Sequence, residues 1–95
     1  MFFLKYDEKV KKVIFSVLEE IDYYESKRTV FNKFLNVLGR SKIFESDLIY
    51  IDKYGDYFSQ ESEIANKIIR FYLRINRPYL ARDFAIKVLK KKNIL

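Results

Sequence analysis

Residues 64–91 read IANKIIRFYLRINRPYLARDFAIKVLKK, and their spacing gives the clearest indication of the fold. On both sides of residues 76–78, apolar residues recur every three or four positions, which is the spacing of an amphipathic helix. Proline is tolerated in the first turn of a helix but not in its interior, so Pro78 marks a boundary between two helices. The pattern predicts two helices paired as an αα-hairpin, one from residue 59 or 60 to about 75 and one from about 79 to 91.

Helical spacing continues towards the N-terminus, where no linker or low-complexity run interrupts it. Gly39 follows an apolar stripe and predicts a helix end there, because a left-handed glycine commonly closes a helix. Residues 48–51 could also extend as a strand, but no other segment offers a partner strand, so a helix is favoured. Two further helices are expected, from about 8 to 24 with Asp7 as cap and from about 27 to 38 with Ser26 as cap. Residues 41–58 are interpreted as helical, ending near Gly55, but whether they form one helix, two helices or an irregular segment stays open.

These elements predict an all-α fold in which residues 1–95 form a single domain. We expect a compact domain of four to five helices that ends in a basic αα-hairpin, the subregion of residues 64–95. The chain has 95 residues, of which 49% are hydrophobic and only 2 are glycine and 1 is proline. Such a composition offers enough apolar surface for one core and argues against disorder.

The net charge of +6 is concentrated in the predicted hairpin. Residues 1–63 contain 10 basic and 12 acidic residues, a net charge of −2, whereas residues 64–95 contain 9 basic residues and one acidic residue, a net charge of +8. A charge asymmetry of this kind is a more specific indication of a polyanionic partner than the isoelectric point of the whole chain.

The basic residues predict a nucleic-acid interface, for DNA or RNA. Lysine and arginine neutralise phosphates and release counterions, and a nearby Tyr72 or Tyr79 could stack on an unpaired base. Four basic residues share a narrow edge of the first hairpin helix: Lys67, Arg70, Arg74 and Arg77. Three more project from the second helix, away from its apolar face: Arg82, Lys87 and Lys90. The predicted interface comprises Lys67, Arg70, Arg74, Arg77, Arg82, Lys87 and Lys90.

Two other interpretations of these charges stay open. The basic residues could pair with acidic residues inside the same fold, or stabilise a helix C-terminus, as cations commonly do. They could also dock an acidic protein. Candidate internal partners are Glu45, Asp47, Asp52 and Asp56. A sequence-reading helix-turn-helix is not predicted, because Ile69 stands where that motif has a glycine.

No enzyme is predicted. The chain lacks histidine and cysteine, so the commonest general base, thiolate nucleophiles and Cys-type metal sites are excluded. Its two glycines form no phosphate-binding loop. Asp52 and Asp56 are four residues apart, but a helix break at Gly55 would separate them, so we interpret them as a solvated acidic face. We expect no catalytic residue, no metal and no cofactor.

The aromatic content, 9 Phe and 8 Tyr, is more than a small core readily hides. Tyr50, Tyr54 and Tyr57 recur at helical spacing and could form either the edge of the core or a binding surface. Burying surplus apolar surface between subunits is the simplest outlet, so we expect a homodimer. A protein–protein adaptor or a small subunit of a larger complex is the alternative function.

The chain contains no apolar stretch long enough for a membrane span and no signal peptide, so we expect no membrane partner. The absence of cysteine fits a cytoplasmic protein. Abundant lysine and isoleucine are compatible with a thermophilic or viral origin. The sequence thus predicts a non-catalytic interaction module that binds nucleic acid through phosphate contacts of its C-terminal hairpin.

Overall fold

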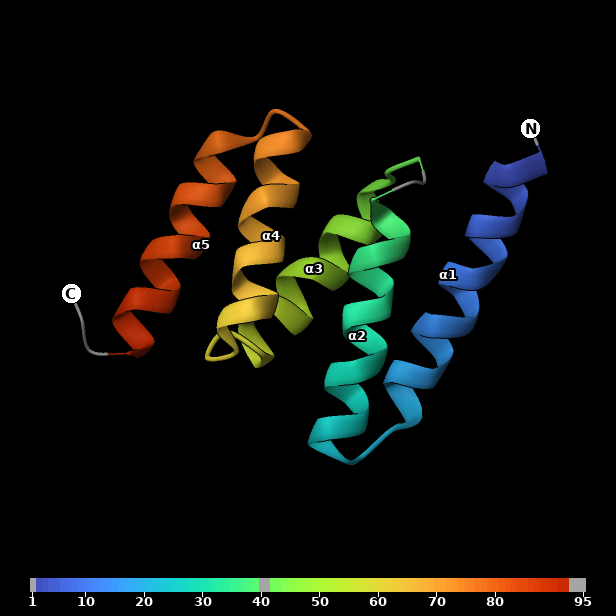
Figure 1. The fold of residues 1–95 in the computed structure, drawn as a ribbon, viewed down its shortest axis with the longest axis horizontal. Coiled ribbons are helices and arrows are strands. Elements are labelled where there is room, and N and C mark those ends of the chain that lie inside the picture. The colour runs from blue at the N-terminus through green and yellow to red at the C-terminus, as the bar shows by residue number, and fades with distance from the viewer. Residues whose placement is uncertain (1, 40–41, 93–95) are drawn as a thin grey trace. The chain divides into compact units, whose positions relative to one another are not determined.

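The computed structural model describes residues 2–39 and 42–92, with side chains for residues 9–39 and 42–92. Within these residues the chain is all-α and contains no strand, which confirms the predicted fold class (Figure 1). The helices are α1 (Phe2–Glu20), α2 (Tyr24–Leu38), α3 (Glu45–Tyr57), α4 (Ser62–Arg74) and α5 (Pro78–Lys91). In the described part of the chain, no helix is both long and apolar enough to cross a membrane.

The chain divides into two compact units, Met1–Phe44 and Glu45–Leu95. The first unit contains α1 and α2, and the second contains α3, α4 and α5. The expectation that residues 1–95 form a single domain stays a prediction.

In the first unit, α1 packs against α2 along an apolar seam. Leu18 of α1 and Phe34 of α2 are fully buried, and the ring of Phe15 meets the ring of Phe34 edge-on at 5.2 Å. Val13 has the helical spacing of an apolar face, yet it is 63% exposed. The apolar periodicity of α1 covers a wider face than its contact with α2, because a helix paired with a single neighbour buries only a narrow stripe of its surface.

Lys11 is an unexpected core residue of the first unit. It is only 1% exposed, and its ammonium donates a hydrogen bond to the backbone carbonyl of Lys42 at 2.8 Å. The same nitrogen lies 5.2 Å above the centre of the Phe44 ring. These contacts tie the segment after α2 back to α1, and they satisfy a charge that would be costly to bury alone.

Helix boundaries in the first unit differ from the predicted ones. α1 begins at Phe2 and ends at Glu20, so Asp7 is not its cap. α2 begins at Tyr24, after Tyr23 with no side-chain cap hydrogen bond, so Ser26 lies inside the first turn. Gly39 does follow the end of α2, but its φ of −63° is right-handed, because its N–H bonds to Asn36 and continues the turn.

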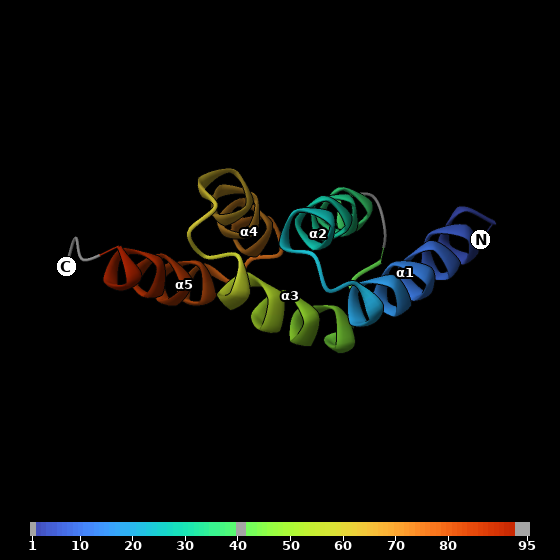
Figure 2. The ribbon, with the colours of Figure 1, turned by 90° about the horizontal axis from the view of Figure 1, so that it is seen from below.

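In the second unit, α4 packs against α5 and α3. Figure 2 shows α3 on one side of the α4–α5 pair. The core combines apolar side chains of all three helices and of the turn after α3: Ile51, Tyr54, Phe58, Ile64, Ile68, Phe71, Tyr72, Ala81, Phe84 and Val88.

α3 runs straight through Gly55, so the helix break expected there was wrong. Gly55 is buried where α3 approaches the hairpin: a Cβ atom at this position would lie 3.1 Å from Cδ1 of Ile68 and 3.2 Å from Cε1 of Phe84. Glycine is therefore placed here for a close helix approach, which offsets its poor helix propensity of about 1 kcal/mol.

The hairpin turn forms as predicted. α4 ends at Arg74, and α5 begins at Pro78. Asn76 has a φ of 63°, and the N–H groups of Arg77 and Asn76 bond to the carbonyls of Tyr72 and Leu73, at 2.8 and 3.1 Å. This pattern is a Schellman motif with asparagine in the left-handed position, and it returns the chain along α4.

Candidate nucleic-acid interface

The predicted basic edge lies on the solvent side of α4. The opposite side of this helix carries the buried residues Ile64 and Ile68, whereas Arg70 and Arg74 are exposed. Arg77, in the turn after α4, is exposed as well, and Lys67 is partly exposed. We name Arg70, Arg74 and Arg77 the arginine edge.

The arginine edge has no carboxylate partner within the described residues. Arg70 has neither a hydrogen bond nor an ion pair there, and the guanidinium of Arg74 lies over the ring of Phe71 at 5.6 Å. Arg77 donates a hydrogen bond from Nη1 to the hydroxyl of Tyr79 at 3.2 Å. That hydrogen bond raises the pKa of the Arg77 guanidinium above its ordinary value, and the negative charge of Glu45 adds to the rise.

Of the other basic residues predicted to bind nucleic acid, some form ion pairs with carboxylates and others do not. Lys67 pairs with Glu63 at 3.8 Å, one turn away on α4. Arg82 reaches Oδ1 of the neighbouring Asp83 at 3.3 Å, an exposed contact of small energy. Lys90 is exposed and has no ion pair among the residues that the structure describes.

Lys87 faces α3 and belongs to a two-step ladder of ion pairs. Its ammonium lies 3.9 Å from Asp52, and one turn later Lys91 lies 2.9 Å from Asp56. Both pairs advance by four residues on each helix, so the two aspartates share a face of the uninterrupted α3. Internal pairing, the alternative that the sequence left open, thus applies to these two lysines and not to the arginine edge.

Asp52 and Asp56 are held by lysines and meet no third carboxylate. Across residues 9–39 and 42–92, no three acidic side chains come together in a way that could hold a metal ion. The sequence predicted that the two aspartates belong to an acidic, solvated face. In the structure they neutralise part of the hairpin's positive charge where α5 passes α3.

The tyrosines do not form an exposed stripe on α3. Tyr54 is 3% exposed and stacks on Tyr50 at 6.0 Å, and Tyr57 is half-exposed. Tyr72 is buried and cannot stack on a base, whereas Tyr79 is half-exposed beside Arg77. Tyr79 is thus the aromatic side chain next to the arginine edge that a base could reach.

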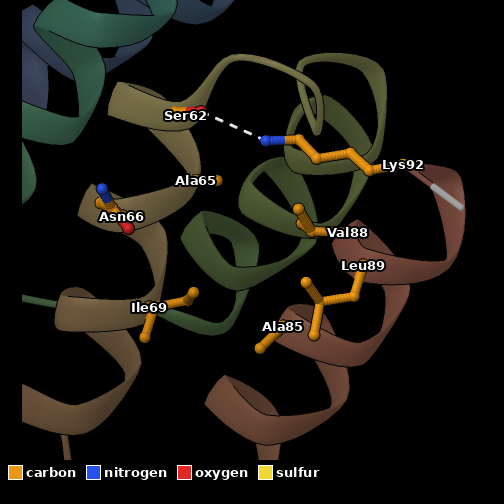
Figure 3. Close-up of a pocket in the computed structure, with 8 residues that line it drawn as sticks. All are labelled: Ser62, Ala65, Asn66, Ile69, Ala85, Val88, Leu89 and Lys92. Atoms are coloured by element: carbon orange, nitrogen blue, oxygen red, sulfur yellow. Dashed lines mark hydrogen bonds between the residues drawn. The ribbon is translucent and has the colours of Figure 1, made fainter. Parts of the chain in front are cut away.

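The structure also contains a groove between α4 and α5, which sequence reasoning missed. It measures about 290 Å³ and opens on the face of the hairpin away from α3 (Figure 3). Ile69 and Leu73 have the helical spacing of core residues, but Ile69 lines the groove and Leu73 is 55% exposed. The small residues Ala65 and Ala85, one on each helix, were the available signal, because small side chains in the walls between two helices leave a gap.

Chemically, the arginine edge offers three guanidinium groups to an anion. Each guanidinium presents a planar fork of N–H donors that matches phosphate oxygens, and its charge does not depend on pH in the physiological range. Arg70 and Arg74 lie one turn apart on α4, and Lys67 lies about one turn before Arg70. Arg77 was predicted on the same helix edge but follows in the turn, because α4 ends at Arg74. Comparisons with protein-family models, curated proteins and solved structures found no match to this chain.

Proposed function

We propose that this chain is a non-catalytic module that binds nucleic acid through the phosphate backbone. The contact surface is the arginine edge, which Lys67 and Lys90 extend. The observation that carries the proposal is that Arg70, Arg74 and Arg77 are all exposed and that none forms an ion pair with a carboxylate among the described residues.

Charge repulsion is the physical reason for assigning this edge to an anion. Like charges three or four residues apart on a helix destabilise it by a few tenths of a kcal/mol per pair. A polyphosphate relieves that repulsion and releases its own counterions. Arg70 and Arg74 are separated by one helical turn, about 6 Å along the axis, so one strand can meet both.

Arg82 and Lys87 contribute less than the arginine edge. Asp83 and Asp52 already neutralise them, and a phosphate would have to displace these carboxylates. No base-reading element is proposed, so binding is governed by charge and shape rather than by sequence. Tyr79 favours single strands, whose unpaired bases stack on exposed aromatic rings.

Fluorescence anisotropy with labelled duplex DNA, single-stranded DNA and single-stranded RNA tests the proposal. We expect a dissociation constant in the micromolar range at about 50 mM salt and strong weakening at about 200 mM. The double variant Arg70→Glu/Arg74→Glu loses binding with unchanged helicity by circular dichroism. No binding of the unmodified chain at low salt overturns the proposal.

A matched control separates the edge from net charge. The variant Lys12→Glu/Lys33→Glu changes the net charge by the same amount, and both lysines are exposed on α1 and α2. This control keeps binding close to that of the unmodified chain. If both double variants lose affinity equally, overall charge and not the arginine edge is responsible.

The proposal includes a homodimer, supported by exposed apolar side chains in both units. Val13 on α1 and Ile49 on α3 are 63% and 66% exposed. Light scattering on the purified chain tests this part separately, and a monomer at micromolar concentration overturns the dimer while leaving the nucleic-acid proposal standing.

A further inference from the structure

Besides the arginine edge, the hairpin has a second candidate binding surface, the open groove between α4 and α5. Its walls come from one side of each helix, and α3 lies behind them, so the groove opens away from α3 (Figure 3). Its lining combines apolar and polar side chains: Ser62, Ala65, Asn66, Ile69, Ala85, Val88, Leu89 and Lys92.

Exposed apolar side chains continue the groove along both helices. Leu73 follows Ile69 by four residues and is more than half exposed, and Ile86 precedes Leu89 by three and is partly exposed. Residues three or four apart on a helix are neighbours on one face, so these pairs extend the apolar strip beyond the groove itself.

The rim of the groove is cationic. Lys92 closes one end of it, where its ammonium donates a hydrogen bond to the hydroxyl of Ser62 at 3.2 Å (Figure 3). Arg70 follows the groove residue Asn66 by one turn and has no carboxylate partner among the described residues. No acidic residue is among the eight that line the groove.

The carboxylates of α4 and α5 do not neutralise this rim. Glu63 pairs with Lys67, and Asp83 pairs with Arg82. An occupant of the groove therefore meets apolar walls between positive charges that the two helices leave uncompensated.

We infer that the groove docks an amphipathic helix of a partner protein, with acidic side chains flanking its apolar face. A helix presents apolar anchors at positions three and four apart, which suits a narrow strip between two helices. The volume of about 290 Å³ is at the lower limit for a drug-sized ligand and has room for one or two anchor side chains.

A second copy of this chain does not suit the groove. In a twofold interface the same surface meets itself, so two hairpins, each with a net charge of +8 over residues 64–95, would face one another. Like charges across an interface cost several kcal/mol and select against a partner. The complementary occupant is therefore acidic. This inference does not rest on nucleic-acid binding, because the apolar strip of the groove lies beside the arginine edge and not on it.

Isothermal titration of the full chain with designed peptides tests the inference. The probe is a helical peptide of about 18 residues with leucine at positions three and four apart and glutamate on the flanking positions. Its counterpart carries lysine in place of every glutamate. The glutamate peptide binds with a dissociation constant in the micromolar range, and the lysine peptide binds at least about tenfold more weakly.

Two neutral variants locate the binding site. Ala85→Leu fills the groove and Leu73→Ala shortens the apolar strip, and each weakens the glutamate peptide by about tenfold, as loss of an interface anchor does. Ile49→Ala, which shortens an equally exposed side chain on α3, leaves peptide binding unchanged. Circular dichroism confirms that all three variants keep their helicity.

Four outcomes overturn the inference. They are equal binding of the two peptides, no binding of the glutamate peptide, unchanged binding by both groove variants, and dissociation of a dimer into monomers by Ala85→Leu in sedimentation experiments. The last result would assign the groove to a second copy. Ala85→Leu leaves nucleic-acid binding intact, so failure of the peptide experiment and failure of the proposed function are separately observable.

Discussion

The division between internally paired and outward-facing cations makes a quantitative prediction about salt dependence. Arg70 and Lys87 each carry one positive charge on the hairpin, and both are exposed. Arg70 has no ion pair among the described residues, whereas Lys87 lies 3.9 Å from Asp52. The substitutions Arg70→Gln and Lys87→Gln remove the same charge from the sequence, yet we expect different effects on binding to duplex DNA.

The magnitude follows from the number of phosphate contacts. The logarithm of the binding constant falls with the logarithm of salt concentration by about 0.9 for each phosphate neutralised. Three contacts from the arginine edge give a slope of about −2.7, a loss of affinity of about 40-fold between about 50 and 200 mM salt. Arg70→Gln reduces the slope to about −1.8, a loss of about 12-fold over the same range.

Lys87→Gln leaves the slope near that of the unmodified chain, because its charge is already balanced by Asp52. It lowers the free energy of unfolding instead, by less than about 1 kcal/mol, since the pair is exposed to solvent. Arg70→Gln has no ion pair to lose and relieves repulsion with Lys67 and Arg74, so the free energy of unfolding rises by a few tenths of a kcal/mol at most.

Anisotropy titrations at several salt concentrations measure the slopes, and urea denaturation measures the stabilities. The reasoning is refuted if Lys87→Gln lowers the slope as much as Arg70→Gln does. It is also refuted if Arg70→Gln leaves the slope unchanged, because the arginine edge would then make no phosphate contact.

Three further predictions concern the fold of the second unit. Asn76 has a φ of 63°, so Asn76→Gly keeps or raises the melting temperature. Asn76→Ala lowers the free energy of unfolding by about 1 kcal/mol and the melting temperature by about 4–8 °C. The opposite order of the two variants in a thermal scan would contradict the Schellman turn. Gly55→Ala lowers stability by about 1 kcal/mol in urea denaturation, because crowding against Ile68 and Phe84 outweighs the better helix propensity, and a stabilised variant would show that those side chains yield freely. Burial raises the pKa of Tyr72 above its ordinary value of 10.0, so the unfolded chain releases this proton at lower pH than the folded chain does. The contribution of the protonated hydroxyl to the free energy of unfolding is complete below pH 10.0 and is lost as the pH rises above it. In urea denaturation at alkaline pH, Tyr72→Phe should flatten that decline.

Local patterns explain why the hairpin was predicted well. The helical spacing of residues 64–91 and the position of Pro78 depend on neighbouring residues, and the ends of α4 and α5 fall within three residues of the predicted ones. The exposure of Arg70 and Arg74 follows from the same periodicity, since the apolar side of α4 is buried. Their role in binding stays a prediction.

Features that depend on contacts between helices were not predictable in this way. Glycine at position 55 indicates a break when only its propensity is considered, but α3 continues through it and brings it close to Ile68 and Phe84, where a Cβ atom would be crowded. Lys11 reads as a surface charge until the carbonyl of Lys42 is placed beside it. Val13 has the spacing of a core residue but lies off the seam with α2.

The helices, the turn at residues 76–78 and the concentration of positive charge in residues 64–95 follow from the sequence alone, because helical periodicity and charge are properties of consecutive residues. Which charges are compensated depends instead on contacts between helices. Lys87 and Lys91 meet aspartates because α3 continues past Gly55 and passes α5, whereas Arg70 and Arg74 form no ion pair within the described residues because they lie on the other side of α4 from the core. The groove likewise exists only between two packed helices, because its walls combine residues of α4 and α5 that no local pattern brings together.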